Sequence, residues 1–192
     1  MWPVLTAVAV VAGLVAAGIG VLSLADALTA TGLPDPGPVT TVGLPFVRAA
    51  GEIAAAVAVG GFLFAAFLVP PQTTGVLDAA GYRAVRMARG AALVWAACAA
   101  LLVPLTISDV SGEPLREHLD PVAMWRIAGL VDTADAWRWT ALLALIVAVA
   151  ASPVLRWSTT PVLLAGAVMT LIPLGLTGHS AAGGSHDLAA NS

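Results

Sequence analysis

Charge is scarce in this chain, and lysine is absent from it. Only 10% of the 192 residues are charged, and the eight basic residues, all arginine, leave a net charge of -3. This balance excludes the basic stripe that a nucleic-acid-binding domain presents. Soluble domains carry about 25% charged residues, whereas 59% of this chain is hydrophobic and its mean hydropathy is +0.95. The composition therefore indicates an integral membrane protein surrounded by the lipid bilayer.

Paired cysteines and the common catalytic motifs are also missing. The single cysteine, Cys98, lies in an apolar run, so we interpret it as a packing residue that belongs to no disulfide or cysteine metal cluster. The chain has no Walker loop, GxSxG, HExxH or CxxCH motif. ATP hydrolysis, nucleophilic hydrolysis, zinc proteolysis and covalent haem attachment thus have no support. We do not expect an enzyme.

Five apolar runs reach the length of about 20 residues that a bilayer crossing needs. Charges, prolines or glycines bound the runs, and the alternating strand pattern of membrane barrels does not occur. We predict an all-α polytopic membrane bundle of about five transmembrane helices, which makes residues 1–177 a five-span domain. The predicted spans are residues 2–28, 46–69, 90–108, 136–151 and 161–177.

The segments between these runs predict loops and an orientation. Residues 29–45 are rich in proline and glycine, which predicts an irregular loop. Residues 71–89 carry three arginines and one acid, whereas residues 109–138 carry six acids and three arginines. Arginines near span ends stay on the cytoplasmic side. We therefore predict a cytoplasmic N-terminus and an extracytoplasmic segment 178–192.

Short interfacial helices are expected between residues 113 and 131. Asp120 precedes Pro121, a pairing that favours a helix start. The apolar residues that follow include Trp125, and tryptophan is typical of the membrane interface. We expect one or two helices lying on the membrane surface.

Two of the three histidines, His179 and His186, lie in a Gly-rich segment directly after the last span. Imidazole suits copper and zinc, although two ligands alone leave a site incomplete. His118 and Met124 could add an imidazole or a thioether, and a thioether favours Cu(I). The alternatives are a solvated polar loop for the histidine pair and a packing role for Met124.

Arg48 and Glu52 are one helical turn apart near the start of the second span. Ionisable residues within a membrane are costly and often functional, yet this pair can neutralise itself. The pair could serve as a structural anchor or as part of an ion path, and the sequence leaves both roles open.

Two segments resemble a known family. Residues 174–188, LGLTGHSAAGGSHDL, resemble the part that precedes the C-terminal spans of CopD-like copper resistance membrane proteins. Residues 105–115, LTISDVSGEPL, resemble the actinobacterial branch, in which a CopD-like half is fused to a cytochrome c oxidase assembly half. The resemblance implies copper uptake or transfer at the inner membrane, with His179 and His186 contacting copper. It also implies that segment 178–192 leads into further spans.

A second function class stays open. Abundant alanine and glycine allow close helix packing, which also suits a non-catalytic structural or assembly subunit of a larger membrane complex, linked to cytochrome c oxidase biogenesis. Such a subunit would bind a partner membrane protein and no ion. Copper content of the purified protein distinguishes the two functions.

Overall fold

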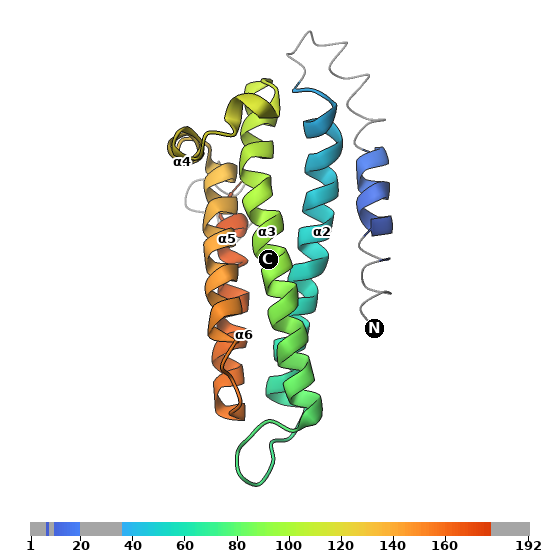
Figure 1. Ribbon diagram of the computed structural model, residues 1–192, viewed down its shortest axis with the longest axis vertical. Helices are drawn as coiled ribbons and strands as arrows, with labels where there is room; N and C mark the ends of the chain where they lie inside the picture. Colours follow the sequence, from blue (N-terminus) through green and yellow to red (C-terminus); the bar gives the residue numbers. More distant parts are fainter. Residues whose placement is uncertain (1–6, 8–9, 20–35, 178–192) are drawn as a thin grey trace. The chain divides into compact units, whose positions relative to one another are not determined.

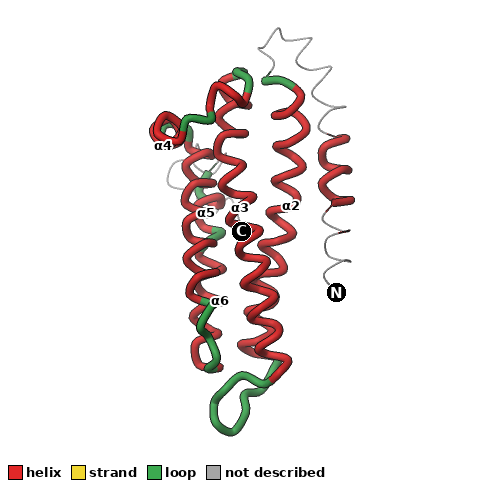
Figure 2. The backbone as a smooth tube through the Cα atoms, viewed as in Figure 1, coloured by secondary structure: helices red, strands yellow, loops and turns green. Residues whose placement is uncertain are grey.

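The computed structural model describes residue 7 and residues 10–19 and 36–177. These residues form helices and, apart from one isolated β-bridge, no β-structure (Figures 1 and 2). The predicted all-α membrane bundle is confirmed. Four described helical segments are long and apolar enough to cross a bilayer: Pro38–Leu68, Ala79–Ser111, Asp132–Ala150 and Trp157–Gly175. A shorter apolar helix, Val10–Ile19, falls within the first predicted span, and most other residues of that span lie outside the described ones.

The chain divides into two compact units, which are described separately. Unit 1 comprises residues 1–51 and 98–138, and unit 2 comprises residues 52–97 and 139–192. Three long helices each contribute residues to both units: α2 (Pro38–Leu63), α3 (Ala79–Ser111) and α5 (Asp132–Ala150).

Helix α2 (Pro38–Leu63) begins well before the apolar run that predicted it. The loop expected over residues 29–45 is therefore wrong from Pro38 onward. Proline suits the first helical position because its missing N–H would have no helical partner there. The Gly37 carbonyl, on a residue with φ of 88°, accepts two backbone N–H groups of the first turn. Pro45 lies inside the helix, as membrane helices tolerate when neighbouring groups satisfy the freed carbonyl.

Helix α3 (Ala79–Ser111) has 33 residues, which is about 50 Å at 1.5 Å per residue. Because the hydrocarbon layer is about 30 Å thick, the ends of α3 reach beyond it. The loop predicted over residues 71–89 is wrong from Ala79 onward, since its arginines belong to the first turns of α3. Helical backbone bonding simply continues past the apolar run.

The buried face of α3 repeats every seven residues. This spacing is the one that keeps a side-chain seam in contact with neighbouring helices. Three of the six positions in the seam are alanine, which lets helix backbones approach closely there. The repeating buried positions are Val85, Ala92 and Ala99, and Ala88, Trp95 and Leu102.

The short helices predicted between residues 113 and 131 are present in unit 1. A 3-10 turn, η2 (Leu115–His118), is followed by helix α4 (Pro121–Ala128). The Asp120 carboxylate caps α4 by accepting the Val122 N–H at 2.9 Å, so the acid before proline starts this helix as expected. Helix α5 (Asp132–Ala150) then begins the next span.

Unit 2 packs the end of α2 and the start of α3 against α5 and α6 (Thr160–Met169). α2 continues into a π-helical segment, η1 (Phe64–Leu68). The last span starts with the 3-10 turn η3 (Trp157–Thr159) and is interrupted at Thr170, before the short helix α7 (Ile172–Gly175). The unbroken helix expected there is therefore divided.

An isolated antiparallel bridge joins two connections of unit 2. Val76 pairs with Arg156, the Leu77 N–H donates to Leu155 O at 2.9 Å, and the Trp157 N–H donates to Gly75 O at 3.1 Å. The α2–α3 and α5–α6 connections are thus held together by backbone hydrogen bonds.

Candidate copper-handling site

His118 is a buried histidine at the end of the η2 turn in unit 1. Its side chain is 5% exposed, and its Nε2 lies 3.1 Å from Ser111 Oγ and 3.5 Å from Glu113 Oε2. The Glu113 carboxylate itself is 63% exposed. The imidazole is therefore enclosed, and its polar contacts face the segment that links α3 to η2.

The hydroxyl of Ser111 lies beside Nε2 of His118. A serine hydroxyl has one proton to donate and two lone pairs that accept. Ser111 Oγ donates to Ser108 O at 3.4 Å and accepts the Glu113 N–H at 3.2 Å. The second lone pair of Ser111 Oγ faces His118 Nε2. The Glu113 carboxylate beside Nε2 can only accept a hydrogen bond. With its proton on Nε2, neutral His118 would donate to these acceptors and leave the lone pair of Nδ1 for a metal or another donor.

A second hydroxyl, Ser108, ties this segment to the start of α2. Ser108 Oγ donates to Glu113 O at 2.6 Å and therefore accepts from Thr40 Oγ1 at 2.7 Å. Both Thr40 and Ser108 are fully buried. The polar network Thr40–Ser108–Glu113–Ser111–His118 thus connects α2, the end of α3 and η2.

Gly112 allows this network to close. Its φ is 70°, a left-handed conformation that residues with a Cβ adopt at a cost. The Gly112 N–H returns to Ser108 O at 3.0 Å, which ends α3 with the local geometry that glycine favours at a helix C-terminus. The turn brings Glu113 back beside Ser108 and Ser111.

Helix α4 is fixed against α5 by Arg138. The guanidinium lies over the Trp125 ring, 4.3 Å from its centroid, and Nη1 donates to Trp125 O at 3.2 Å. Arg138 also forms an ion pair with Asp135. Met124, the neighbour of Trp125, is half-buried on α4.

The other predicted site residues are placed as follows. Arg48 and Glu52 are both on α2, four residues apart, and both are exposed. His179 and His186 lie outside the described residues. Within the described ranges, no group of three or more His, Cys, Asp or Glu side chains is arranged to hold a metal ion.

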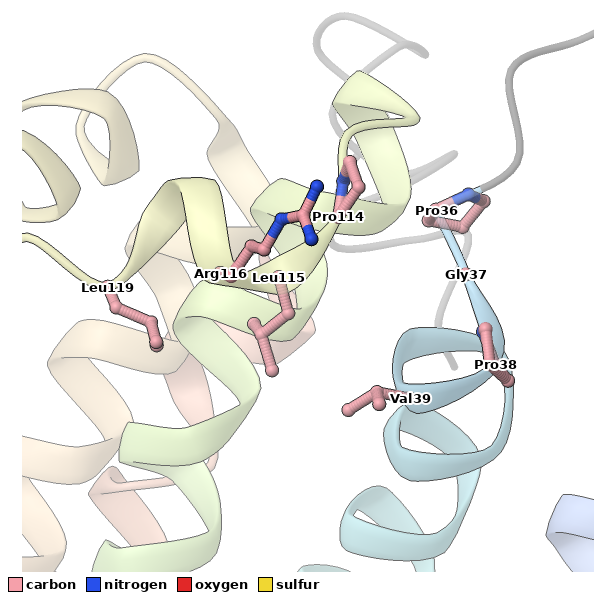
Figure 3. A pocket seen from close by; sticks show the side chains of 8 residues that line it. All are labelled: Pro36, Gly37, Pro38, Val39, Pro114, Leu115, Arg116 and Leu119. Atoms are coloured by element: carbon pink, nitrogen blue, oxygen red, sulfur yellow. The ribbon is translucent and has the colours of Figure 1, made fainter.

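An apolar groove of about 300 Å³ lies beside this network (Figure 3). The first turn of α2 forms one wall, and the start of η2 forms the other. Its lining has no imidazole, thiol or thioether, so the groove offers copper no ligand. The lining residues are Pro36, Gly37, Pro38, Val39, Pro114, Leu115, Arg116 and Leu119.

The sequence pointed to His118 but not to its four partners in the network. Ser108, Ser111 and Glu113 are within ten residues of His118, and their spacing around Gly112 was a local signal of a polar turn. Thr40 carried no such signal, because 68 residues separate it from Ser108.

The fold and the network define a helical, multi-pass membrane protein with a buried histidine at a helix end. The chain belongs to the family described as copper resistance protein D-like, N-terminal domain, whose sequence model matches residues 39–187. The CopD-like resemblance is confirmed, and with it a connection to copper handling. The match includes His118, Met124, His179 and His186.

Uncharacterized mycobacterial proteins are similar to the chain. One from Mycobacterium leprae (strain TN) is 28% identical over 173 residues, covering 90% of this chain and 26% of the relative. Two others, from Mycobacterium bovis and Mycobacterium tuberculosis, are each 28% identical over 175 residues, covering 91% of this chain and 26% of the relative. The chain thus spans about a quarter of the length of these relatives. No solved structure matches it.

Proposed function

We propose that this chain handles copper at the bacterial plasma membrane, where it takes part in copper uptake or transfer and has no catalytic role. The five-span domain 1–177 would hold the N-terminus in the cytoplasm and present segment 178–192 on the outer side. The observation that carries the proposal is the buried His118, held through Nε2 in a segment that the copper resistance family match covers.

The chemistry of His118 supports this proposal. Histidines that bind metals usually use one ring nitrogen for the metal and donate from the other to an oxygen acceptor. Nε2 of His118 lies near Ser111 Oγ and the Glu113 carboxylate, and in the proposal it donates to them, so that Nδ1 is the ligand atom. In the proposal, His179 and His186 are the first copper contacts, and His118 or Met124 supplies a third.

Metal analysis of the purified, copper-loaded protein tests the proposal. We expect His179→Ala with His186→Ala to abolish stoichiometric copper, and His118→Ala to lower the copper affinity. Ser111→Ala is expected to weaken copper binding by about tenfold or more, because the orientation of the imidazole is lost. Met169→Leu, on the exposed side of α6, is the matched control and should bind copper as the unmodified protein does.

The result that contradicts the proposal is unchanged copper stoichiometry in the variant that lacks both tail histidines. If that variant and His118→Ala both keep their copper, the ligands have been assigned wrongly. If the unmodified protein binds none, copper handling itself is wrong.

A structural or assembly subunit, linked to cytochrome c oxidase biogenesis, is the second candidate. The close helix contacts favour it: a Cβ added to Gly61 would lie 2.9 Å from Ala88 Cβ. Such tight contacts suit a scaffold that packs against further membrane helices. Copper-free protein that co-purifies with a membrane partner would support this function instead.

A further inference from the structure

Four arginines of unit 2 have no acidic partner in the part of the chain that the structure describes. Arg83, Arg86 and Arg89 are on the first turns of α3, and Arg156 is in the connection between α5 and α6. Among the described residues, none of the four forms an ion pair with a carboxylate. Of the three acids of unit 2, Asp78 is the nearest to α3 in sequence, and its Oδ1 accepts the Gly81 N–H at 2.6 Å. Glu52 is on α2, and Asp187 lies outside the described residues.

Two of the four arginines of unit 1 show a different pattern. Arg116 pairs with Glu117 at 3.2 Å, and Arg138 pairs with Asp135. These two guanidinium groups have counterions within the protein. Among the described residues, the four unit 2 arginines have no carboxylate counterion, so an anionic ligand can supply one.

Hydrogen bonds orient two of these four arginines, which together are called the arginine cluster. Arg89 Nε donates to Ser152 Oγ at 2.9 Å, and Arg83 Nε donates to Ala79 O at 3.0 Å. Both bonds use Nε and leave the terminal Nη groups for other acceptors. The bridge between Val76 and Arg156 fixes the backbone of Arg156 to the connection that leads into α3.

The position of the cluster relative to the apolar part of α3 suggests the partner. The uncharged run of α3 starts at Gly90, directly after Arg89. A helix of about 50 Å that crosses a layer of about 30 Å carries its polar end into the headgroup region. Headgroup phosphates lie at this depth, and guanidinium groups bind phosphate with two parallel hydrogen bonds.

We propose that Arg83, Arg86, Arg89 and Arg156 form a binding site for the phosphate of an anionic phospholipid. A zwitterionic headgroup brings its own cation, which four arginines repel, so the site selects anionic over zwitterionic lipid. Each arginine near a charged lipid surface strengthens the interaction about fivefold. The site is independent of the copper ligands.

Lipid retention by the intact, detergent-purified protein tests this proposal. Dioleoyl phosphatidylglycerol and dioleoyl phosphatidylcholine are offered separately, and bound lipid is counted by native mass spectrometry. We expect the unmodified protein to retain phosphatidylglycerol preferentially. Arg86→Gln with Arg156→Gln should weaken that binding about 25-fold, because neither side chain has an intramolecular partner among the described residues and the fold should persist.

Matched variants make the outcome specific. Arg116→Gln with Arg126→Gln removes the same charge from unit 1 and should change phosphatidylglycerol retention by less than twofold. Arg86→Lys should bind phosphatidylglycerol more weakly than the unmodified protein and more strongly than Arg86→Gln. Lysine keeps the positive charge but lacks the planar guanidinium that binds phosphate with two parallel hydrogen bonds. Circular dichroism verifies that each variant keeps its helix content.

Three results would overturn the proposal. The first is equal retention of the two lipids by the unmodified protein. The second is equal loss in the unit 1 and unit 2 double variants, which indicates a general charge effect. The third is displacement of phosphatidylglycerol by millimolar inorganic phosphate, which indicates a site for soluble anions.

Discussion

The hydroxyl pair Thr40 and Ser108 allows a quantitative test of the polar network. Ser108→Ala removes two short hydrogen bonds at once, one from Thr40 and one to Glu113 O. A hydrogen bond contributes about 1 kcal/mol net, so we expect the variant to lose about 2 kcal/mol of unfolding free energy. Thr40→Val keeps the shape of the side chain and the Ser108–Glu113 bond, and should lose about 1 kcal/mol.

The double variant isolates the bond between the two side chains. Once Ser108 is alanine, the Thr40 hydroxyl has no partner there, so adding Thr40→Val should cost little more. The combined loss should be about 1 kcal/mol smaller than the sum of the two single losses. Unfolding in mixed micelles with increasing SDS, followed by far-UV circular dichroism, measures each value.

A control and a refuting result complete this test. Ser158→Ala changes an exposed serine of η3 and should stay within about 0.5 kcal/mol of the unmodified protein. Strict additivity of the two single losses would refute the hydrogen bond between Thr40 and Ser108. A larger loss for Thr40→Val than for Ser108→Ala would refute the central place of Ser108 in the network.

Three further predictions concern other parts of the chain. Gly112→Ala should cost about 1–2 kcal/mol in the same unfolding assay because φ is 70° there, and Gly112→Asn should cost less; equal losses would contradict the backbone argument. Glu52→Gln should lower the folded yield in membranes and Arg48→Gln with Glu52→Gln should recover it, measured by size-exclusion chromatography, whereas normal folding with lost copper uptake in the double variant would assign the pair to an ion path. Copper bound by His179 and His186 should weaken as pH falls through about 6.5, because only neutral imidazole ligates; equilibrium dialysis that shows pH-independent binding would exclude these ligands.

The sequence predicted the spans well where hydrophobic runs coincide with helices. Residues 90–108 and 136–151 lie almost entirely within α3 and α5. The boundaries were poor, because hydropathy marks the hydrocarbon layer whereas backbone hydrogen bonding continues through polar residues such as Arg83. The start of α2 was predicted wrongly because its prolines were taken to indicate a loop. Pro38 starts the helix, and Pro45 is tolerated within it.

The sequence predicted one residue of the candidate site, His118, but not the contacts of its side chain. His118 was identified from its residue type, which is rare in this chain. Its burial and its contact with Ser111 depend on the turn at Gly112, and the link from Ser108 to Thr40 depends on the packing of α2 beside α3. Such long-range contacts leave no local pattern in a single sequence.

The π-helical segment η1 affects how faces of the preceding helix are assigned. A π-helical turn holds more residues than the 3.6 of an α-helical turn, so a helical wheel drawn at a constant 100° per residue loses its register there. The buried pairs 61–62 and 65–66, followed by buried Val69, are spaced by four residues. Substitutions meant for the lipid-facing side near Phe67 should therefore be chosen from a wheel started within η1, and sequence alignments should be anchored separately before and after it.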